Sequence, residues 1–592
     1  MVLKPAISVE HNIASYAVDL ATALGPDTVF SLTGGMAMYL NRAVAAHPTL
    51  QPVYCQHEQA CVAAAEGYAK AADFRKPGFA LVTAGPGVSN SVTSLVSAYG
   101  DSTPLIVLAG QIKTADIDPY GTRTHGVQEI RSREIVTPCV KRFARLSTEN
   151  FRETLVEVIA EGLSGRPGPV FIEIPLDVQG KRVEYTEAEI ATEAKKIHQI
   201  VESAHCFGQQ KLTEALEALL AAKRPLLYVG NGCRIAGVEQ AAIDFLRRHR
   251  IPAVFSWLSF DILPADDPLC FGCPGGLAPI SANEILSHAD VVVFLGARLD
   301  LGTTAFQRGD FGSQARRYFV DIDSHELAKF DGYAAALQVH ADLHALPHVV
   351  GQMDPQNSAA NADWLPWCVA RRDEYLAEER SRLVSREMNV YNLTQRISKW
   401  ANGRVIVPAS SGYAEETFSR FFMPGTGTRF FNGAALGAMG LGLPHAIGAA
   451  FGSSRRVVCL EADGGIMLNL QELATLVHYS PKGFVILLLN NDGYESIRAS
   501  QTRHFGILTG VDADSGVYIP DFRKVSQAFG LHYEAVNSLD DFERLLPALG
   551  SECEPVLVDM HISRFEPRGP GVKTIMGPDG KPSTTPLSEI SW

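Results

Sequence analysis

Short runs rich in Val, Ile and Leu recur along the 592-residue chain and constrain its fold more than any other feature. Examples are FALVTAGPG (79–87), PVFIEIP (169–175), VVVFLGAR (291–298), RVVCLEADGG (456–465) and FVILLLNN (484–491). The runs finish at Gly, Asp, Asn or Pro, and helical segments separate them. Strands that are apolar on both faces are typical of buried parallel sheets covered by helices. The sequence therefore predicts an α/β fold of doubly wound parallel sheets.

Two polar stretches, residues 180–204 and 351–389, lack strand character and indicate linkers or connecting helices between domains. A chain of this length also exceeds one ordinary domain. We expect three α/β domains followed by an extended tail or lid rich in Pro and Gly, at residues 1–185, 200–350, 375–565 and 566–592. Open parallel sheets bind their ligands at the carboxyl ends of the strands, so the functional residues are expected there.

Composition excludes several classes of function. Hydrophobic residues make up 46% and charged residues 20% of the chain, which is typical of a globular enzyme. The net charge of −13 and the absence of a basic cluster argue against nucleic acid as a partner. No segment approaches the roughly 18 apolar residues of a membrane span, and the first residues do not resemble a secretion signal. Ten scattered cysteines indicate reduced thiols, so we expect a cytoplasmic protein.

The most informative polar residues are Asp463 and Asn491, which lie 28 positions apart at the ends of two successive predicted strands. A helical crossover places such strands side by side, so the carboxylate and the amide are expected to meet at one sheet edge. Oxygen ligands suit Mg²⁺ that also carries a diphosphate. Gly464 and Gly465 would let the backbone approach the phosphates at a helix N-terminus. Taken alone, the same residues are also ordinary turn formers.

This spacing resembles the diphosphate-binding signature of thiamine diphosphate enzymes, in which Gly-Asp-Gly is followed by two asparagines nearly thirty residues on; Ala462 replaces the first glycine. The resemblance implies thiamine diphosphate and Mg²⁺ as cofactors. It also implies that Asp463, Asn491 and the Gly493 carbonyl bind the metal, with Tyr494 beside the cofactor.

A second segment, VYCQHEQACVAAAEGYAKAA, contains Glu58 at the start of a predicted helix. With LVTAGPGVSNSVTSLVSAYGDSTPLIVLAGQ, it resembles the first domain of acetohydroxyacid synthases and related enzymes. In that family the glutamate hydrogen-bonds the pyrimidine ring and favours the imino tautomer, which removes the thiazolium proton; the cofactor then acts as an electron sink. The resemblance implies this role for Glu58. Outside this context, a first-turn glutamate would be a surface residue that interacts with the helix dipole.

The segment FNGAALGAMGLGLPHAIGAA resembles the part of the family that grips the pyrimidine ring. The resemblance implies that the Gly437 carbonyl accepts a hydrogen bond from the aminopyrimidine and that Met439 bends the cofactor. The alternative is a Gly/Ala-rich helix packed in a core, which is the expected role of residues 446–450.

The middle block resembles the FAD-binding domain of acetohydroxyacid synthases, with Gly230, Gly232 and Arg298 as candidate contacts. The glycines alone form a weak motif, because the third glycine of the usual dinucleotide spacing is displaced. The planar guanidinium of Arg298 suits a phosphate or ribose, although a structural ion pair is an alternative. We expect a non-redox FAD.

Features at the first domain favour carboligation. Simple decarboxylases of the family carry an acidic residue and a histidine pair as proton donors, whereas this chain has Gly35 and the single His125. Gln128 matches the glutamine that acetohydroxyacid synthases place over the reacting centre.

After the asparagines, NNDGYESIRASQ departs from those synthases and looks like the flavin-containing carboligases of branched-chain sugar biosynthesis. Tyr494, Arg498 and Gln501 are expected to line the acceptor pocket or to be structural.

We therefore predict a thiamine diphosphate-dependent carboligase that decarboxylates pyruvate or a similar 2-oxo acid and transfers the acyl carbanion to a ketone or keto acid. The alternatives within this chemistry are acetolactate synthase proper and a hydrolase that cleaves a cyclic 1,2-dione. A flavin or nicotinamide dehydrogenase is disfavoured, because it has no use for Glu58 with Asp463 and Asn491. The family builds its sites between subunits, which implies a homodimer or homotetramer.

Overall fold

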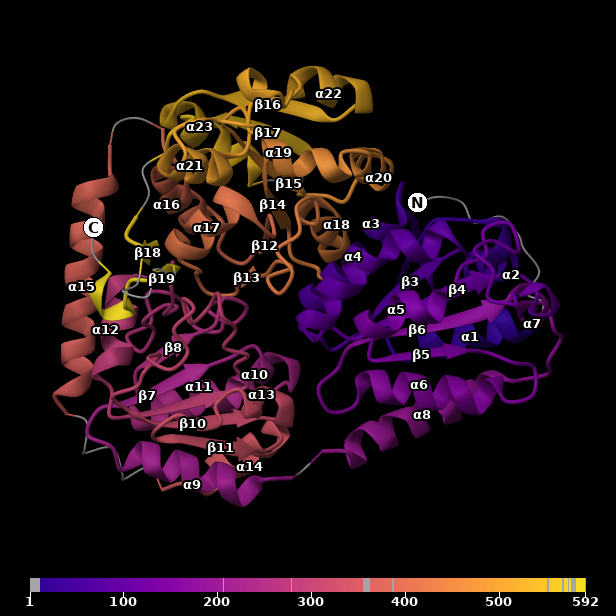
Figure 1. The fold of residues 1–592 in the computed structure, drawn as a ribbon, viewed down its shortest axis with the longest axis horizontal. Helices are drawn as coiled ribbons and strands as arrows, with labels where there is room; N and C mark the ends of the chain where they lie inside the picture. The colour runs from indigo at the N-terminus through magenta and orange to yellow at the C-terminus, as the bar shows by residue number, and fades with distance from the viewer. Residues whose placement is uncertain are drawn as a thin grey trace.

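The computed structural model describes residues 11–590 except 206, 278, 355–361, 386–387, 551–552, 567–568, 573 and 577–581. It contains three parallel sheets, each in its own α/β domain (Figure 1), which confirms the predicted fold class. In the described part of the chain, no helix has both the length and the apolar character needed to cross a membrane.

The N-terminal domain, indigo to purple in Figure 1, is built on a six-stranded sheet in the order β2-β1-β3-β4-β6-β5. Its strands are β1 (Thr28–Ser31), β2 (Gln51–Tyr54), β3 (Gly78–Val82), β4 (Leu105–Gln111), β5 (Arg142–Arg145) and β6 (Pro169–Pro175). Its helices are α1 (Ile13–Ala23), α2 (Met38–Ala46), α3 (Glu58–Ala71), α4 (Pro86–Gly100), α5 (Ser132–Val136), α6 (Phe151–Leu163) and α7 (Leu176–Gln179). Helix α8 (Glu187–Ser203) leads to the middle domain.

The middle domain contains a five-stranded sheet in the order β11-β10-β9-β7-β8. Its strands are β7 (Pro225–Val229), β8 (Ala253–Phe255), β9 (Val291–Leu295), β10 (Arg316–Asp321) and β11 (Ala336–His340). Its helices are α9 (Gln209–Leu220), α10 (Gly232–Ile235), α11 (Glu239–His249), α12 (Ile280–His288), α13 (Ser324–Ala328) and α14 (Leu346–Gln352). Helix α15 (Trp364–Leu383) runs along the side of the molecule towards the C-terminal domain (Figure 1).

The C-terminal domain has a six-stranded sheet in the order β13-β12-β14-β15-β17-β16. Its strands are β12 (Val405–Pro408), β13 (Arg429–Phe430), β14 (Val457–Ala462), β15 (Val485–Asn490), β16 (His532–Val536) and β17 (Val556–His561). Its helices are α16 (Val390–Trp400), α17 (Gly412–Phe421), α18 (Gly442–Gly452), α19 (Asp463–Ile466), α20 (Glu472–Tyr479), α21 (Glu495–His504), α22 (Phe522–Phe529) and α23 (Leu539–Leu549).

The predicted tail at 566–592 lies partly outside the described residues. Its described part forms a small antiparallel pair of strands, β18 (Thr574–Met576) and β19 (Pro582–Thr584). The side chain of Gln307 in the middle domain donates hydrogen bonds to Thr584 and Thr585. A role for the tail as a lid stays a prediction.

Helices α3 and α18 join the first and last domains through small residues. A side-chain carbon built on Gly67 would lie 2.1 Å from the carbonyl oxygen of His445, and one on Gly448 would lie 1.8 Å from that of Ala64. Only glycine allows the two backbones to approach this closely. The packing fixes α3, which begins at Glu58, against the C-terminal domain.

A buried lysine reinforces the same junction. The ammonium group of Lys70 on α3 lies 2.6 Å from Glu66 and 2.8 Å from Asp101, and it donates to the carbonyl of Asn432 at 2.7 Å. These charged side chains are almost completely buried. Buried charges require partners, so the ammonium is needed to offset the two carboxylates.

We expect K70M to lower the free energy of unfolding by about 3–5 kcal/mol, because it removes the ammonium that Glu66 and Asp101 share and leaves each buried carboxylate with only its second partner, His445 or Arg298. Urea denaturation measures the change. The exposed Lys196 supplies the control, since K196M removes only a surface contact with Glu193 and should cost less than about 1 kcal/mol. Equal stability of the two variants would contradict this account of the junction.

Candidate functional site

The structure brings Asp463 and Asn491 together at the carboxyl edge of the C-terminal sheet. Strands β14 and β15 are parallel neighbours, and Ala462 pairs with Leu489. The Asp463 carboxylate is fully buried and accepts hydrogen bonds from the backbone amides of Gly464 (2.7 Å), Asn491 (3.1 Å) and Gly493 (2.9 Å). The loop after β15 is therefore wrapped around this carboxylate.

The donor set at this edge fits a hard cation. The side-chain oxygen of Asn491 is buried and has no hydrogen-bond partner among the described residues. Burial raises the pKa of Asp463 to about 6, because the ionised carboxylate is removed from water. A divalent cation would satisfy the amide oxygen and stabilise the ionised carboxylate together, which is the oxygen chemistry that Mg²⁺ prefers. The residues present fit a magnesium ion.

Glycines let other groups approach the start of α19. A side-chain carbon on Gly464 would lie 2.3 Å from Cε1 of Tyr494, so the aromatic ring lies directly against this backbone. A carbon on Gly465 would lie 2.8 Å from the Glu461 carboxylate. The predicted cofactor residues Gly464, Gly465 and Tyr494 thus form one packed unit next to Asp463.

Sequence reasoning missed Glu461. This residue is completely buried in strand β14, and burial raises its pKa to about 7. Its carboxylate lies against the start of α18, where a side-chain carbon on Gly442 would be only 2.2 Å away. An acidic residue inside the apolar run RVVCLEADGG was the available signal.

Glu58 lies at the junction of the first and last domains. It is 7% exposed, and the side-chain amide of Asn90 on α4 donates to its Oε2 at 3.0 Å. Next to it, the backbone amide of Gln56 donates to the Glu472 carboxylate at 3.0 Å. The side-chain amide of Asn469 donates to the side-chain oxygen of Gln59 at 3.4 Å. The start of α3 therefore contacts the segment that follows Asp463 in the same chain.

Gly437 and Met439 lie in the loop that precedes α18. Gly437 has φ +64°, a conformation that favours glycine, and a side-chain carbon there would lie 3.4 Å from the Ser410 carbonyl at the end of β12. Met439 is half-buried. Asn469 donates to the Gly440 carbonyl at 2.8 Å, which ties this loop to the residues beside Glu58.

Gly35 and Gln128 lie on the exposed side of the N-terminal domain. Gly35 follows β1, and a side-chain carbon built on it would have no described atom within 4 Å apart from its own neighbours along the chain. Gln128 is exposed and has φ +62°; its carbonyl lies against Gly85, the residue that precedes α4. His125 in the same loop is also exposed. The structure shows no contact of the Gln128 side chain with the cation site.

A large cavity of about 1280 Å³ lies between the N-terminal and middle domains. Gly232, Arg298 and Asp321 are among its lining residues, all close to carboxyl ends of the middle sheet. Gly230 does not line it; a side-chain carbon there would lie 2.1 Å from the Gly296 carbonyl. Gly230 therefore allows the ends of β7 and β9 to approach closely.

Arg298 faces this cavity and is also held by the protein. It donates to the Gly100 carbonyl at 2.7 Å, to Asp101 at 3.2 Å and to Asp300 at 3.1 Å. The structural ion pair that was expected as the alternative role of Arg298 is therefore present. It does not exclude a ligand contact, because a guanidinium has five N–H donors.

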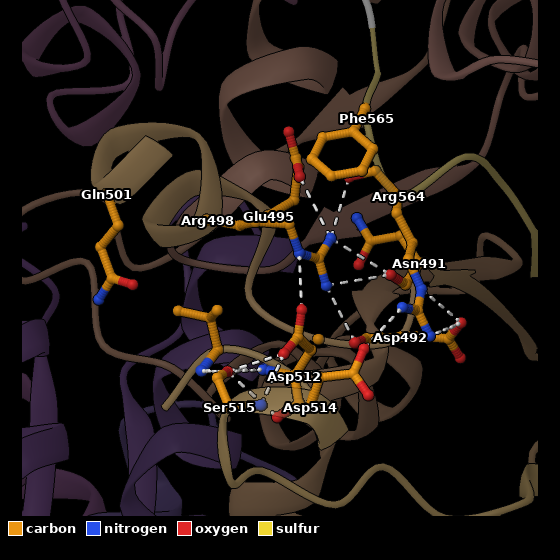
Figure 2. A network of polar contacts seen from close by, with 12 residues as sticks. Asn491, Asp492, Glu495, Arg498, Gln501, Asp512, Asp514, Ser515, Arg564 and Phe565 are labelled. Carbon is orange, nitrogen blue, oxygen red and sulfur yellow. Dashed lines mark hydrogen bonds and ion pairs between the residues drawn. The ribbon is translucent and has the colours of Figure 1, made fainter. Parts of the chain in front are cut away.

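The two further residues expected at the acceptor pocket are engaged in loop contacts. Gln501 accepts from the Thr509 amide at 2.8 Å and donates to the Thr509 carbonyl at 3.0 Å. Arg498 is completely buried and contacts the backbone of Asn491 and Asp492. Figure 2 shows the Gln501 side chain apart from this arginine network. These contacts favour the structural alternative for both residues.

Comparison with known families gives one consistent result along the chain. Three models of thiamine pyrophosphate enzymes match in order: the N-terminal TPP binding domain at residues 11–135, the central domain at 212–348 and the C-terminal TPP binding domain at 410–560. Together they cover more than half of the sequence. The first and last matches contain Glu58 and Asp463 respectively.

Curated relatives extend over almost the whole chain. The acetolactate synthase isozyme 2 large subunit of Escherichia coli (strain K12) is 29% identical over 98% of this chain and 100% of its own length. The acetolactate synthase large subunit of Haemophilus influenzae is 28% identical over 92% of this chain and 93% of its own. The acetolactate synthase large subunit of Lactococcus lactis subsp. lactis is 26% identical over 92% of this chain and 91% of its own length.

We expect Mg²⁺ binding in the presence of thiamine diphosphate to weaken about tenfold per pH unit below pH 6, because protons then compete with the cation for Asp463. Isothermal titration between pH 5 and 8 measures this. Titration of the cofactor without protein corrects for protonation of its diphosphate. A protein affinity that stays constant from pH 7 to 5 would contradict the assignment.

Proposed function

Because the chain belongs to the thiamine pyrophosphate enzymes, we propose that it is a carboligase that decarboxylates pyruvate or a similar 2-oxo acid and joins the acyl unit to a ketone or keto acid. The observation that supports this most directly is the buried oxygen set of Asp463 and Asn491 in a chain that also places Glu58 at the domain junction. The acetolactate synthases among its relatives support pyruvate as the donor.

In the proposed mechanism, bound thiamine diphosphate supplies the electron sink that makes a carbonyl carbon nucleophilic. Glu58 holds a proton at the pyrimidine end, and the hydrogen bond from Asn90 fixes the orientation of its carboxyl group. The Gly437 carbonyl and Met439 hold the pyrimidine. Asp463, Asn491 and the Gly493 carbonyl would hold Mg²⁺, which would offset the charge of a diphosphate, and Gly464 and Gly465 would leave the backbone open to the phosphates.

The surroundings of Gly35 support carboligation over simple release of an aldehyde. No acid or histidine is present at that position to donate a proton, and the space around Gly35 is open. The chain would therefore leave room for a second carbonyl compound and supply no proton from this position. We assign Gln128 to orient the reacting groups.

We also propose that two or four copies assemble and that a second copy covers the exposed Gln128 loop. In a single copy, large apolar side chains are exposed on the first and last domains, as is typical of surfaces that a partner covers. They include Tyr120, Val127, Phe505, Ile507 and Tyr518. A cytoplasmic location remains part of the proposal; the nine cysteines in the described residues are free thiols, which suits a reducing compartment.

Acetolactate synthase proper is the second candidate, because the curated relatives bear that name over their full length. In that case the acceptor is itself a 2-oxo acid. The segment NNDGYESIRASQ departs from the pattern of acetohydroxyacid synthases, which favours a different carbonyl compound as the acceptor.

The function is tested with carbon-labelled pyruvate, thiamine diphosphate and Mg²⁺, with and without a panel of ketones and diketones, using NMR to identify products. We expect a tertiary alcohol that requires the added ketone. Acetolactate formed from pyruvate alone would instead favour the second candidate, and unreacted pyruvate under all conditions would refute the choice of donor.

In the same assay, E58Q should lower turnover at least about a hundredfold, because an amide cannot hold the catalytic proton. Glu187, an exposed first-turn glutamate of α8, provides the matched control, and E187Q should retain activity. Near-normal activity of E58Q would remove Glu58 from the mechanism.

We further propose that FAD occupies the cavity between the N-terminal and middle domains in a non-redox role. The cavity has the volume for a dinucleotide, and its walls combine the guanidinium of Arg298 with Asp321, a carboxylate at a strand end. Dinucleotide-binding sheets use such a carboxylate for ribose hydroxyls. Gly230 would act indirectly, by allowing the strand ends to approach.

The purified protein should contain flavin, and R298M should retain several-fold less of it because the cavity loses its cation. Visible absorption and chromatography of the released cofactor measure the content. R316M, which alters an exposed arginine of the same sheet, should keep the wild-type amount. A flavin-free wild type, or an R298M protein with full flavin content, would contradict this proposal.

A further inference from the structure

The loop Asn491–Gly493 has a backbone that needs support from its surroundings. Asp492 has φ +58° and Gly493 has φ +137°, so two successive residues adopt positive φ values. Conformations of this kind are sparsely populated by residues other than glycine and persist only where neighbouring groups determine them. The loop also provides the orphaned Asn491 oxygen of the proposed cation site.

One side of this loop is held by Asp463. The amides of Asn491 and Gly493 donate to its carboxylate at 3.1 and 2.9 Å. The Asn491 carbonyl belongs to a buried residue and therefore needs a donor from elsewhere, because buried backbone oxygens require partners.

Arg498 supplies that donor from the first turn of α21. Its guanidinium lies 3.4 Å from the Asn491 carbonyl through both terminal nitrogens, and Nη2 donates to the Asp492 carbonyl at 3.0 Å. The side chain is completely buried. Figure 2 shows the guanidinium directed at this part of the backbone. The loop is thus held between an anion on one side and a cation on the other.

The remaining contacts of Arg498 fix its position and balance its charge. Glu495 lies 3.3 Å and Asp512 lies 3.4 Å from the guanidinium, and the Arg564 carbonyl accepts from Nη1 at 2.9 Å. The Phe565 ring lies over it, with 5.9 Å between Cζ and the ring centroid. Two carboxylates offset the single positive charge, so the guanidinium adds little repulsion toward a nearby cation.

From this geometry, we propose that Arg498 is a positioning residue that holds the loop Asn491–Gly493 so that its oxygens face the cation. This inference rests on the proposed magnesium and thiamine diphosphate site, and Arg498 touches neither cofactor nor substrate in it. Loss of the arginine therefore weakens cation binding more than it slows turnover at saturating cofactor. Residues that orient metal ligands typically affect affinity about 10–100-fold.

The test compares R498M and R498K with a matched control, R317M. Arg317 is also buried, and among the described residues it donates to loop carbonyls alone, those of Gly309, Phe311 and Ala334 in the middle domain. Isothermal titration of Mg²⁺ in the presence of thiamine diphosphate gives the affinity. Thermal unfolding without cofactors reports the cost to the fold, and kcat is measured at saturating Mg²⁺ and thiamine diphosphate.

We expect R498M to bind Mg²⁺ at least about tenfold more weakly than wild type, with a smaller change in kcat. The Mg²⁺ affinity of R498K should lie between those of wild type and R498M, because an ammonium cannot reproduce the planar fork of donors. R317M should bind Mg²⁺ like wild type, whatever its loss of thermal stability.

Wild-type affinity in R498M would overturn the proposal, and so would an equal loss of affinity in R317M. If R498M does not fold, R498K decides: a loss of Mg²⁺ affinity supports the positioning role and unchanged affinity refutes it. A wild-type protein that binds no Mg²⁺ with thiamine diphosphate would refute the proposed function as well. An unchanged R498M in an active, cofactor-binding background refutes only the role of Arg498.

Discussion

Buried charges of opposite sign connect the three domains, and the geometry of both candidate sites depends on them. Asp101 at the end of α4 accepts from Lys70 at 2.8 Å, from Arg298 of the middle domain at 3.2 Å and from the Ala435 amide of the C-terminal domain at 3.0 Å. Each group is costly to bury alone, so the contacts must form together. A single carboxylate thereby fixes one wall of the large cavity relative to the loop that contains Gly437.

A second cluster repeats this arrangement at Asp73, which follows the end of α3. Asp261 of the middle domain lies 2.8 Å from Arg234 and 3.1 Å from Arg429 of the C-terminal domain, and Arg429 also lies 3.0 Å from Asp73 of the N-terminal domain. Two such clusters restrict rotation between domains more than either one alone. Because the α3–α18 packing tolerates only glycine at its closest points, apolar contact and ion pairing specify the same domain arrangement.

The sequence predicted the parts of this structure that follow from local periodicity. The strands and the meeting of Asp463 with Asn491 were predictable, because apolar runs identify buried strands and a crossover makes successive strands neighbours. The roles of Arg498 and Arg298 were not predictable to the same degree. The sequence left a ligand contact and a structural role open for both arginines. Their contacts are with backbone carbonyls and carboxylates that only the tertiary structure brings together, although Arg298 also lines the large cavity. Contacts such as Gln56 with Glu472 join residues more than 400 positions apart and leave no local signal.

Buried carboxylates around the candidate site link cofactor binding to stability. Burial raises the pKa values of Asp463 to about 6 and of Glu461 and Glu472 to about 7, above those of an unfolded chain. A raised pKa stabilises the folded state at low pH, and this contribution is lost as pH rises through the folded value. At neutral pH the cofactor-free fold therefore includes the cost of burying ionised or partly ionised acids. The proposed cation at Asp463 would offset part of that cost, so the charge proposed to bind the diphosphate would also stabilise this edge of the sheet.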